Sequence, residues 1–239
     1  MTSDAHDDQR CEKTDSIFSL AELIPTNRLL YYPCSGLDTR FPLERFADSI
    51  DSFWFADMRY VKDLRKPIED FVIHCPSGYT LEARTKLIVH PASRDPYIAL
   101  RCQLRHRESR RQIEVLYLAN DAVGVFQALE KADKKLAVFF YRRDGVSEGG
   151  SNLWWLHPTP ALDGVPAFLE RVLGIIEPGG KIVSDGSNAL EEFVEKQPNG
   201  SSGNNKLVGF DCKQWRLHPD GPIDPQCDRT MIWSVSLVP

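Results

Sequence analysis

The sequence predicts an α/β protein with a doubly wound, mostly parallel sheet in three α-β-α layers, a small antiparallel insertion and a terminal antiparallel hairpin. Apolar runs of strand length alternate along the chain with segments of helical spacing, which is typical of parallel strands joined by crossover helices. The chain has 239 residues, of which 42% are hydrophobic, enough to bury a core of its own. We expect a polar tail over residues 1–15 and a single domain over 16–239.

The first expected elements are a short helix and a βαβ unit. Apolar residues recur at helical spacing over 17–24 and stop at Pro25, which predicts a leading helix. An apolar run at 28–33 predicts the first strand, helical spacing at 41–50 predicts a crossover helix, and the aromatic run at 52–57 predicts the second strand. A parallel sheet therefore begins here.

Residues from about 60 to 110 interrupt this rhythm with an insertion. Segments 79–90 and 97–106 alternate apolar and polar residues, which indicates two strands with one buried face. Two prolines bound the stretch 91–96 between them, so we expect a turn there and an antiparallel pair around it.

The α/β alternation then resumes and continues to the fifth parallel strand. Apolar runs at 113–119 and 135–141 predict strands, and the segment 121–132 between them has helical spacing. A second helix is expected over 165–176, followed by a strand at 181–184.

The end of the chain predicts a closing hairpin. A polar, glycine-rich stretch at 198–205 precedes a strand at 206–212, which we expect to pair with a strand at 230–238 across a long loop. That loop, 211–228, contains Cys212 and Cys227, which would form a disulfide only in an oxidising compartment.

Charge and composition exclude several classes of protein. A net charge of −5 at pH 7 argues against a surface built throughout to neutralise phosphates. The longest apolar run, 136–141, is far shorter than the roughly 20 residues of a membrane helix, so no membrane partner is expected. The polar start lacks an apolar export segment, which favours a cytoplasmic protein. Neither the cysteines nor the histidines have the spacing of metal ligands, so we expect no metal.

Candidate chemistry follows the expected parallel strands, where ligands bind in sheets of this kind. The segment Pro33–Asp38 follows the first strand, and its small residues let a ligand approach backbone N–H groups. Asp57 follows the second strand and could accept both hydroxyls of a ribose, while Asn120 and Asp121 could hold an adenine amino group. Each acid alone could equally be a helix cap or a solvated loop residue.

Three glycines surround a carboxylate and a hydroxyl in residues 144–152, which packing alone does not explain. Glu148 could serve as a general base for a substrate hydroxyl or amine. The side chains that would orient the substrate or stack on it are Ser151, Asn152, Trp154 and Trp155. The alternative is an exposed loop that the two tryptophans dock onto the sheet.

The segment Phe168–Asp185, FLERVLGIIEPGGKIVSD, resembles the helix, Pro-Gly-Gly turn and fifth strand of the Rossmann-fold, class I S-adenosylmethionine-dependent methyltransferases, which have seven-stranded sheets. The turn has a physical reason, since a helix that stops in the left-handed conformation at Gly179 or Gly180 returns directly into the sheet. The resemblance spans residues 28–238 and implies S-adenosylmethionine as cofactor and an unknown methyl acceptor as substrate.

Site roles follow from this resemblance. The expected methionine-side loop is 31–38, with Pro33, Cys34, Ser35, Gly36 and Asp38 as cofactor contacts. Asp57 would bind the ribose, and Asn120 with Asp121 would contact the adenine. The residues expected to face the methyl group are Asp144, Glu148 and Ser151.

Two alternatives remain open at the level of sequence. The first loop, YYPCSGLD, has one glycine where the family has two or three, and Pro33 removes a backbone donor, so the fold could serve as a binding or regulatory module without cofactor. An arginine cluster could instead bind nucleic acid, or its charges could protect a strand edge from pairing. The cluster consists of Arg101, Arg105, His106, Arg107, Arg110 and Arg111. Cys34 could be a nucleophile or a small buried residue.

Overall fold

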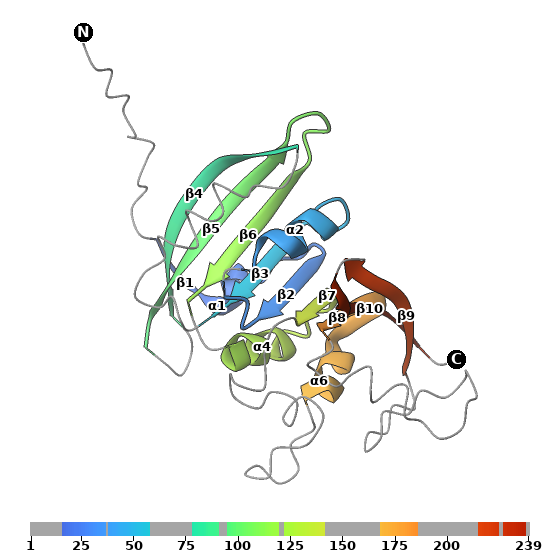
Figure 1. Cartoon of the computed structure of the whole chain (residues 1–239). Helices are drawn as coiled ribbons and strands as arrows, with labels where there is room; N and C mark the ends of the chain where they lie inside the picture. Colours follow the sequence, from blue (N-terminus) through green and yellow to red (C-terminus); the bar gives the residue numbers. More distant parts are fainter. Residues whose placement is uncertain are drawn as a thin grey trace, which may run out of the picture.

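The computed structural model describes residues 16–36, 38–57, 78–90, 95–119, 122–141, 168–185, 215–224 and 227–237. Its ten described strands form one sheet in the order β1-β4-β5-β6-β3-β2-β7-β8-β10-β9 (Figure 1). The strands are β1 (Ser16–Ser19), β2 (Leu29–Pro33), β3 (Ser52–Ala56), β4 (Tyr79–His90), β5 (Tyr97–His106), β6 (Gln112–Leu118), β7 (Leu136–Tyr141), β8 (Ile176–Asp185), β9 (Trp215–Asp224) and β10 (Cys227–Leu237). The helices are α1 (Leu20–Leu23), α2 (Arg40–Phe46), α4 (Ala122–Lys131) and α6 (Phe168–Ile175).

The centre of the sheet consists of five mutually parallel strands. They lie in the order β6-β3-β2-β7-β8, which is third, second, first, fourth and fifth along this part of the chain. This is the doubly wound order, and its switch point falls between β2 and β7. Every residue of β2, β3 and β7 is buried, as expected for strands that are covered on both faces.

The sheet as a whole is mixed, so the expectation of a mostly parallel sheet is correct only for its centre. On one side β4 and β5 are antiparallel and β5 continues onto β6, so the expected insertion extends the main sheet. On the other side β10 runs antiparallel to both β8 and β9. These strands cover the edges that β6 and β8 would otherwise leave open to unwanted pairing.

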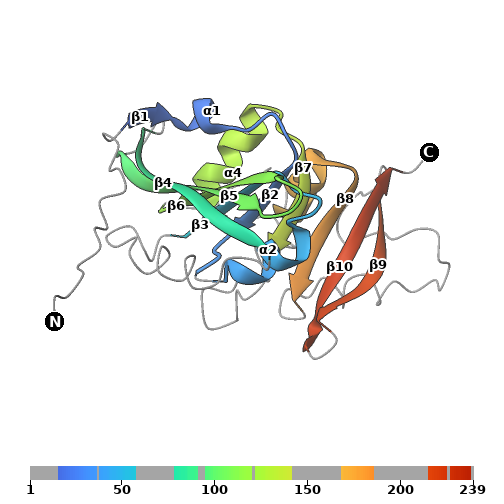
Figure 2. The same ribbon diagram turned by 90° about the horizontal axis from the view of Figure 1, so that it is seen from above.

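The core divides into two clusters on opposite faces of the sheet. Alternate residues of β2 belong to different clusters, with Tyr31 in one and Tyr32 in the other. Helices α1, α4 and α6 contribute to the Tyr31 cluster, and α2 contributes to the Tyr32 cluster (Figure 2). Tyr31 packs on Phe126 of α4 with ring centroids 6.3 Å apart.

The Pro-Gly-Gly segment takes the expected left-handed conformation, but it lies inside a strand. Gly179 has a φ of +78°. Ile176 already pairs with Leu136 of β7 and Lys181 pairs with Val138, so the four residues 177–180 of β8 stand opposite one residue of β7. The chain thus leaves α6 directly into β8 and bulges at the glycines.

Two terminal elements differ from the sequence expectation. Residues 17–24 do not form one helix, because Ile17 and Phe18 pair in β1 with Ile88 and Val89 of β4 and the helix begins only after Ser19. The Ser19 side chain caps α1 together with Glu22, and these hydrogen bonds from Ser19 hold the pKa of Glu22 below its usual value.

The hairpin partner of β10 is β9, which lies within the stretch that was expected to be a loop, and only two residues separate the two strands. The expected strand at 206–212 lies outside the described residues. A polar contact links the three last strands: Ser234 of β10 accepts from Lys181 of β8 at 2.8 Å and donates to Asp220 of β9 at 2.6 Å. This network fixes the hairpin to the sheet.

Among the described helices none is long and apolar enough to cross a membrane. Within the same residues no three His, Cys, Asp or Glu side chains gather as metal ligands.

The two glycines of the α6–β8 region should respond oppositely to alanine. A Cβ on Gly180 would lie 2.8 Å from both the Glu177 carbonyl oxygen and Ile176 Cγ1, so Gly180→Ala should cost about 1–3 kcal/mol. Gly174 lies in α6, and an added Cβ there would meet nothing within 4 Å, so Gly174→Ala should gain about 0.5–1 kcal/mol. Urea unfolding of both variants measures the difference, and equal effects would contradict the tight packing at Gly180.

Candidate functional site

The carboxyl ends of three adjacent parallel strands lie level with one another. Pro33, the last residue of β2, pairs with Ala56 of β3, and Ala56 pairs with Leu118 at the end of β6. Segments that follow these strands therefore start side by side at one edge of the sheet, next to the switch point between β2 and β7. We call this edge the carboxyl edge.

Gly36 is held at the carboxyl edge through both its N–H and its carbonyl group. Its N–H donates to Asp57 Oδ2 at 2.7 Å, and its carbonyl accepts from the Tyr117 hydroxyl at 2.8 Å. Gly36 has a φ of +56°, a conformation that glycine adopts without steric cost. The first loop, the carboxylate after β3 and a tyrosine of β6 thus meet at one residue, Gly36.

The rest of the first loop is also tied to its surroundings. Ser35 N–H donates to the Ala56 carbonyl at 3.2 Å, and Asp38 N–H donates to the Ser35 carbonyl at 2.9 Å. The Tyr32 hydroxyl donates to Asp38 Oδ2 at 3.1 Å. Three backbone N–H groups of the loop, those of Ser35, Gly36 and Asp38, are therefore already engaged, although the sequence suggested that a ligand would use them. The loop therefore places carboxylates at the carboxyl edge, and not the free backbone N–H groups that bind phosphate.

Burial differs sharply among the site residues. Asp57 is 6% exposed and Ser35 is 3% exposed, while Cys34 is exposed and has a φ of +54°. No described residue accepts from or donates to the Ser35 hydroxyl. A buried hydroxyl without a partner is costly, so a polar ligand that reached it would gain a hydrogen bond that the chain leaves unmade.

The structure brings together the first-loop residues and Asp57, and it does not describe the other predicted site residues. Those outside the described residues are Asn120, Asp121, Asp144, Glu148, Ser151, Asn152, Trp154 and Trp155. Tyr32 lies within the expected loop 31–38 but was given no role of its own, and Tyr117 was not among the predicted site residues. Both lie one residue before the last residue of an apolar strand, and a tyrosine there can pack its ring in the core while its hydroxyl reaches the edge.

Three of the six residues of the arginine cluster form ion pairs with neighbouring parts of the sheet. Arg101 pairs with Glu114 of β6, Arg105 pairs with Glu82 of β4, and Arg111 pairs with Asp51 before β3. The charges of these three arginines are thus neutralised by neighbouring strands and turns. Arg107 and Arg110 are exposed in the turn between β5 and β6.

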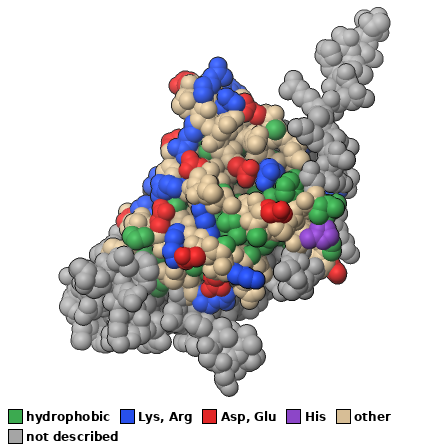
Figure 3. All heavy atoms as spheres, turned by 180° about the vertical axis from the view of Figure 1, so that it is seen from behind, with side chains coloured by type: hydrophobic (Ala, Val, Ile, Leu, Met, Phe, Trp, Pro, Cys, Tyr) green, Lys and Arg blue, Asp and Glu red, His purple; other side chains and the backbone are tan. Residues whose placement is uncertain are grey.

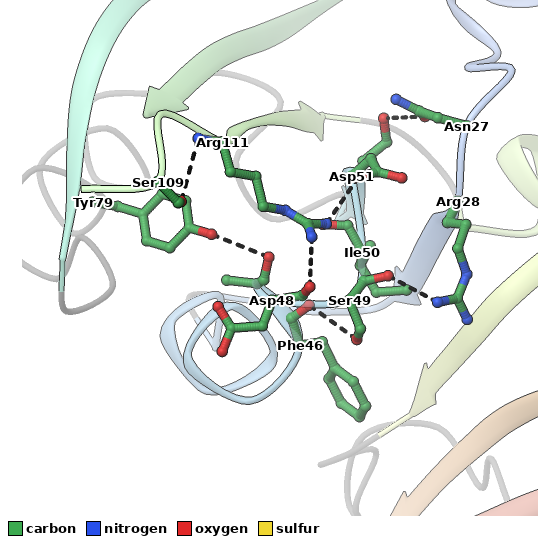
Figure 4. Close-up of polar contacts among 12 residues, drawn as sticks. Asn27, Arg28, Phe46, Asp48, Ser49, Ile50, Asp51, Tyr79, Ser109 and Arg111 are labelled. Carbon is green, nitrogen blue, oxygen red and sulfur yellow. Dashed lines mark hydrogen bonds and ion pairs between the residues drawn. The ribbon is translucent and has the colours of Figure 1, made fainter. Parts of the chain in front are cut away.

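Arg111 belongs to a polar network at the opposite edge of the sheet, where the parallel strands begin (Figure 4). Its guanidinium donates to the Asp48 and Ile50 carbonyls, which follow the end of α2, while Arg28 donates to the Ser49 carbonyl. The Tyr79 hydroxyl donates to the Ala47 carbonyl, and burial raises the pKa of this phenol. The network supplies donors to the carbonyls that a helix end leaves unpaired, which indicates a structural role.

Comparisons with known proteins give only weak likenesses. No family model and no curated protein matches the sequence. A solved rRNA methylase from Streptococcus thermophilus aligns over 92% of each chain with 12% identity and a TM-score of 0.40. A Streptococcus mutans protein described as a candidate methyltransferase, solved with SAH, aligns with 8% identity and a TM-score of 0.35 over 92% of each chain. A 16S rRNA adenine methyltransferase from Catenulisporales acidiphilia aligns over 92% of this chain and 88% of its own, with 8% identity and a TM-score of 0.36.

Two tyrosine hydroxyls at opposite edges make a matched test of the Gly36 contacts. Tyr117→Phe and Tyr79→Phe each remove one hydrogen bond to a backbone carbonyl, and each should cost about 0.5–1.5 kcal/mol of stability. Of the two variants, only Tyr117→Phe should speed amide hydrogen exchange at Gly36, because the Tyr117 hydroxyl holds the Gly36 carbonyl and so steadies the loop whose Gly36 N–H bonds Asp57. Equal exchange at Gly36 in the two variants would contradict the contact.

Proposed function

We propose that the chain binds S-adenosylmethionine at the carboxyl edge and transfers its methyl group to an acceptor. One observation carries the proposal: the Gly36 N–H joins the first loop to Asp57 beside the switch point of a doubly wound sheet. Ligands of such sheets bind outside the carboxyl ends of the strands at that point. A carboxylate after the second strand suits the two hydroxyls of a ribose.

The donors and acceptors of the first loop fit this cofactor better than a phosphate-bearing nucleotide. Anion sites present backbone N–H groups, and here those of Ser35, Gly36 and Asp38 are occupied. S-adenosylmethionine carries no phosphate, and its amino group and ribose hydroxyls can donate hydrogen bonds to carboxylates. Its own carboxylate needs donors other than the N–H groups of Ser35, Gly36 and Asp38. The Asp38 and Asp57 carboxylates and the buried Ser35 hydroxyl would hold it, together with Asn120 and Asp121 after β6.

The acceptor would lie over the segment that follows β7. β7 pairs directly with β2, so the residues after Tyr141 begin beside the first loop. When bound, the cofactor supplies a methyl group activated by the sulfonium, and the protein need mainly hold the acceptor in line with it. In this proposal Glu148 takes the acceptor's proton, Asp144 and Ser151 orient the acceptor, and Asn152, Trp154 and Trp155 bind its body.

A second candidate is a binding module of the same fold without cofactor. The observation that favours this module is that the first loop is already hydrogen-bonded within the chain. Asp57 accepts from the Gly36 N–H, and Asp38 accepts from the Tyr32 hydroxyl. In that case the loop is a structural corner, and the carboxyl edge binds no nucleoside.

Calorimetric titration of the full chain separates the two candidates. We expect S-adenosylmethionine and S-adenosylhomocysteine to bind and ATP not to bind, because the loop lacks unoccupied N–H groups at Ser35, Gly36 and Asp38. At 100 times its dissociation constant a bound ligand should stabilise the fold by about 2.7 kcal/mol. Absence of heat and of thermal stabilisation at millimolar S-adenosylhomocysteine would establish the module instead.

The ribose role of Asp57 has its own matched pair of variants. Asp57→Asn keeps the shape of the side chain and an acceptor for Gly36, but it removes the charge, so affinity for S-adenosylhomocysteine should fall on the order of tenfold or more. Asp133→Asn makes the same change on a side chain that is 83% exposed, after α4, and should leave affinity unchanged. If both variants bind like the unmodified chain, Asp57 is not the ribose ligand.

A further inference from the structure

The antiparallel extension of the sheet carries a concentration of positive charge in an acidic chain. Residues 78–90 and 95–112 contain seven Arg or Lys against three Asp or Glu, whereas the whole chain has 29 against 34. Ion pairs to neighbouring elements hold Arg101, Arg105 and Arg111. The exposed cations of the extension are Arg84, Lys86, Arg107 and Arg110.

Arg107 and Arg110 project from a turn that is held rigidly. His106 N–H donates to the Arg111 carbonyl at 2.8 Å and Arg110 N–H donates to the His106 carbonyl at 3.1 Å, which closes the turn. Arg107 N–H donates to the Gly78 carbonyl at 2.8 Å and ties the turn to the start of β4. In Figure 3, blue side chains gather at the top of the molecule, where Figure 1 places this turn.

Arg110 occupies a backbone conformation that favours glycine. Its φ is +62°, in the left-handed region, and its side chain is exposed. Among the described residues neither Arg107 nor Arg110 forms a direct ion pair, since Glu82, whose pKa is lowered first by hydrogen bonds from Arg105 and Gln112, feels Arg110 only as a weaker, more distant charge. A long cationic side chain kept at a strained position without an ion-pair partner among these residues points to a function outside the fold.

We propose that this turn binds the phosphate backbone of a nucleic acid, with Arg107 and Arg110 as the contacts and the exposed face of β4 with Arg84 and Lys86 as its continuation. Arginine suits this partner because its planar guanidinium binds phosphate oxygens through two parallel hydrogen bonds. The turn precedes β6, and the carboxyl edge follows it, so the length of β6, roughly 20 Å, separates the turn from the candidate cofactor site. The proposal therefore does not depend on cofactor binding.

Fluorescence anisotropy with a labelled 20-nucleotide single-stranded RNA, titrated with the full chain at several salt concentrations, tests the proposal. The test variant is Arg107→Ala with Arg110→Gly, in which glycine suits the positive φ and should preserve or raise thermal stability. The control variant is Lys131→Ala with Lys135→Ala, which removes the same charge at the end of α4 and just before β7, a strand that β3 and β2 separate from β6.

We expect the test variant to lose affinity on the order of tenfold and to reduce the slope of log K against log salt by about 1.4, since each lost phosphate contact on a single strand accounts for about 0.7. The control variant should keep most of the affinity and the slope. Equal losses in both variants, no RNA binding by the unmodified chain at low salt, or binding only to phosphatidylserine vesicles would each overturn the proposal. The RNA titration contains no S-adenosylmethionine, so its result does not depend on the outcome of the calorimetric titration.

Discussion

The hydrogen bond between the Gly36 N–H and the Asp57 carboxylate is the interaction on which the candidate site depends. It joins two segments that are 21 residues apart in sequence and that meet only because β2 and β3 are parallel neighbours of the same length. A carboxylate acceptor makes this hydrogen bond stronger than one between neutral groups. The Tyr117 hydroxyl donates to the carbonyl of the same residue, so three strands determine the position of the loop.

The sheet supports this arrangement from both faces. The central strands bury all their side chains, and aromatic rings of β2 pack against α4 on one face and against the neighbouring strand β7 on the other, where the Tyr32 and Phe140 centroids lie 4.7 Å apart. At the opposite edge Arg111 and Arg28 hold the carbonyls that follow α2. Because α2 connects the first loop to β3, its fixed end limits how far the loop can move. Rigid strands with a loop site at their ends are a common way to position binding residues.

Much of this architecture could be predicted from sequence, and the failures have physical causes. The strands 79–90 and 97–106 appear with the expected bounds because alternation of apolar and polar residues is a strong pattern. The helix expected over 17–24 is wrong at its start, where residues 16–19 form β1. Such a short apolar segment fits a helix and a strand equally well, and only its pairing with β4 decides between them. β9 was missed because Pro219, Gly221 and Pro222 are typical of loops, although a strand at the edge of a sheet tolerates them.

The site could be predicted in part. The rule that ligands bind after parallel strands selected the loop 33–38 and Asp57, and the structure places them in contact. It could not give the roles of Tyr32 and Tyr117, since a buried aromatic residue in a strand looks like ordinary core until its hydroxyl is located. The rule also does not predict that the N–H groups of the loop are already hydrogen-bonded, because this depends on the backbone conformation of Cys34 and Gly36. That engagement of the N–H groups is the reason why we propose a cofactor without phosphate at this edge.

A crystal structure of the full chain grown with S-adenosylhomocysteine tests the central claim most directly. We expect the nucleoside at the ends of β2, β3 and β6, with the ribose hydroxyls within hydrogen-bonding distance of the Asp57 carboxylate. Density for the ligand at any other surface, or an Asp57 side chain that faces only its own loop while the ligand is bound elsewhere, would contradict it.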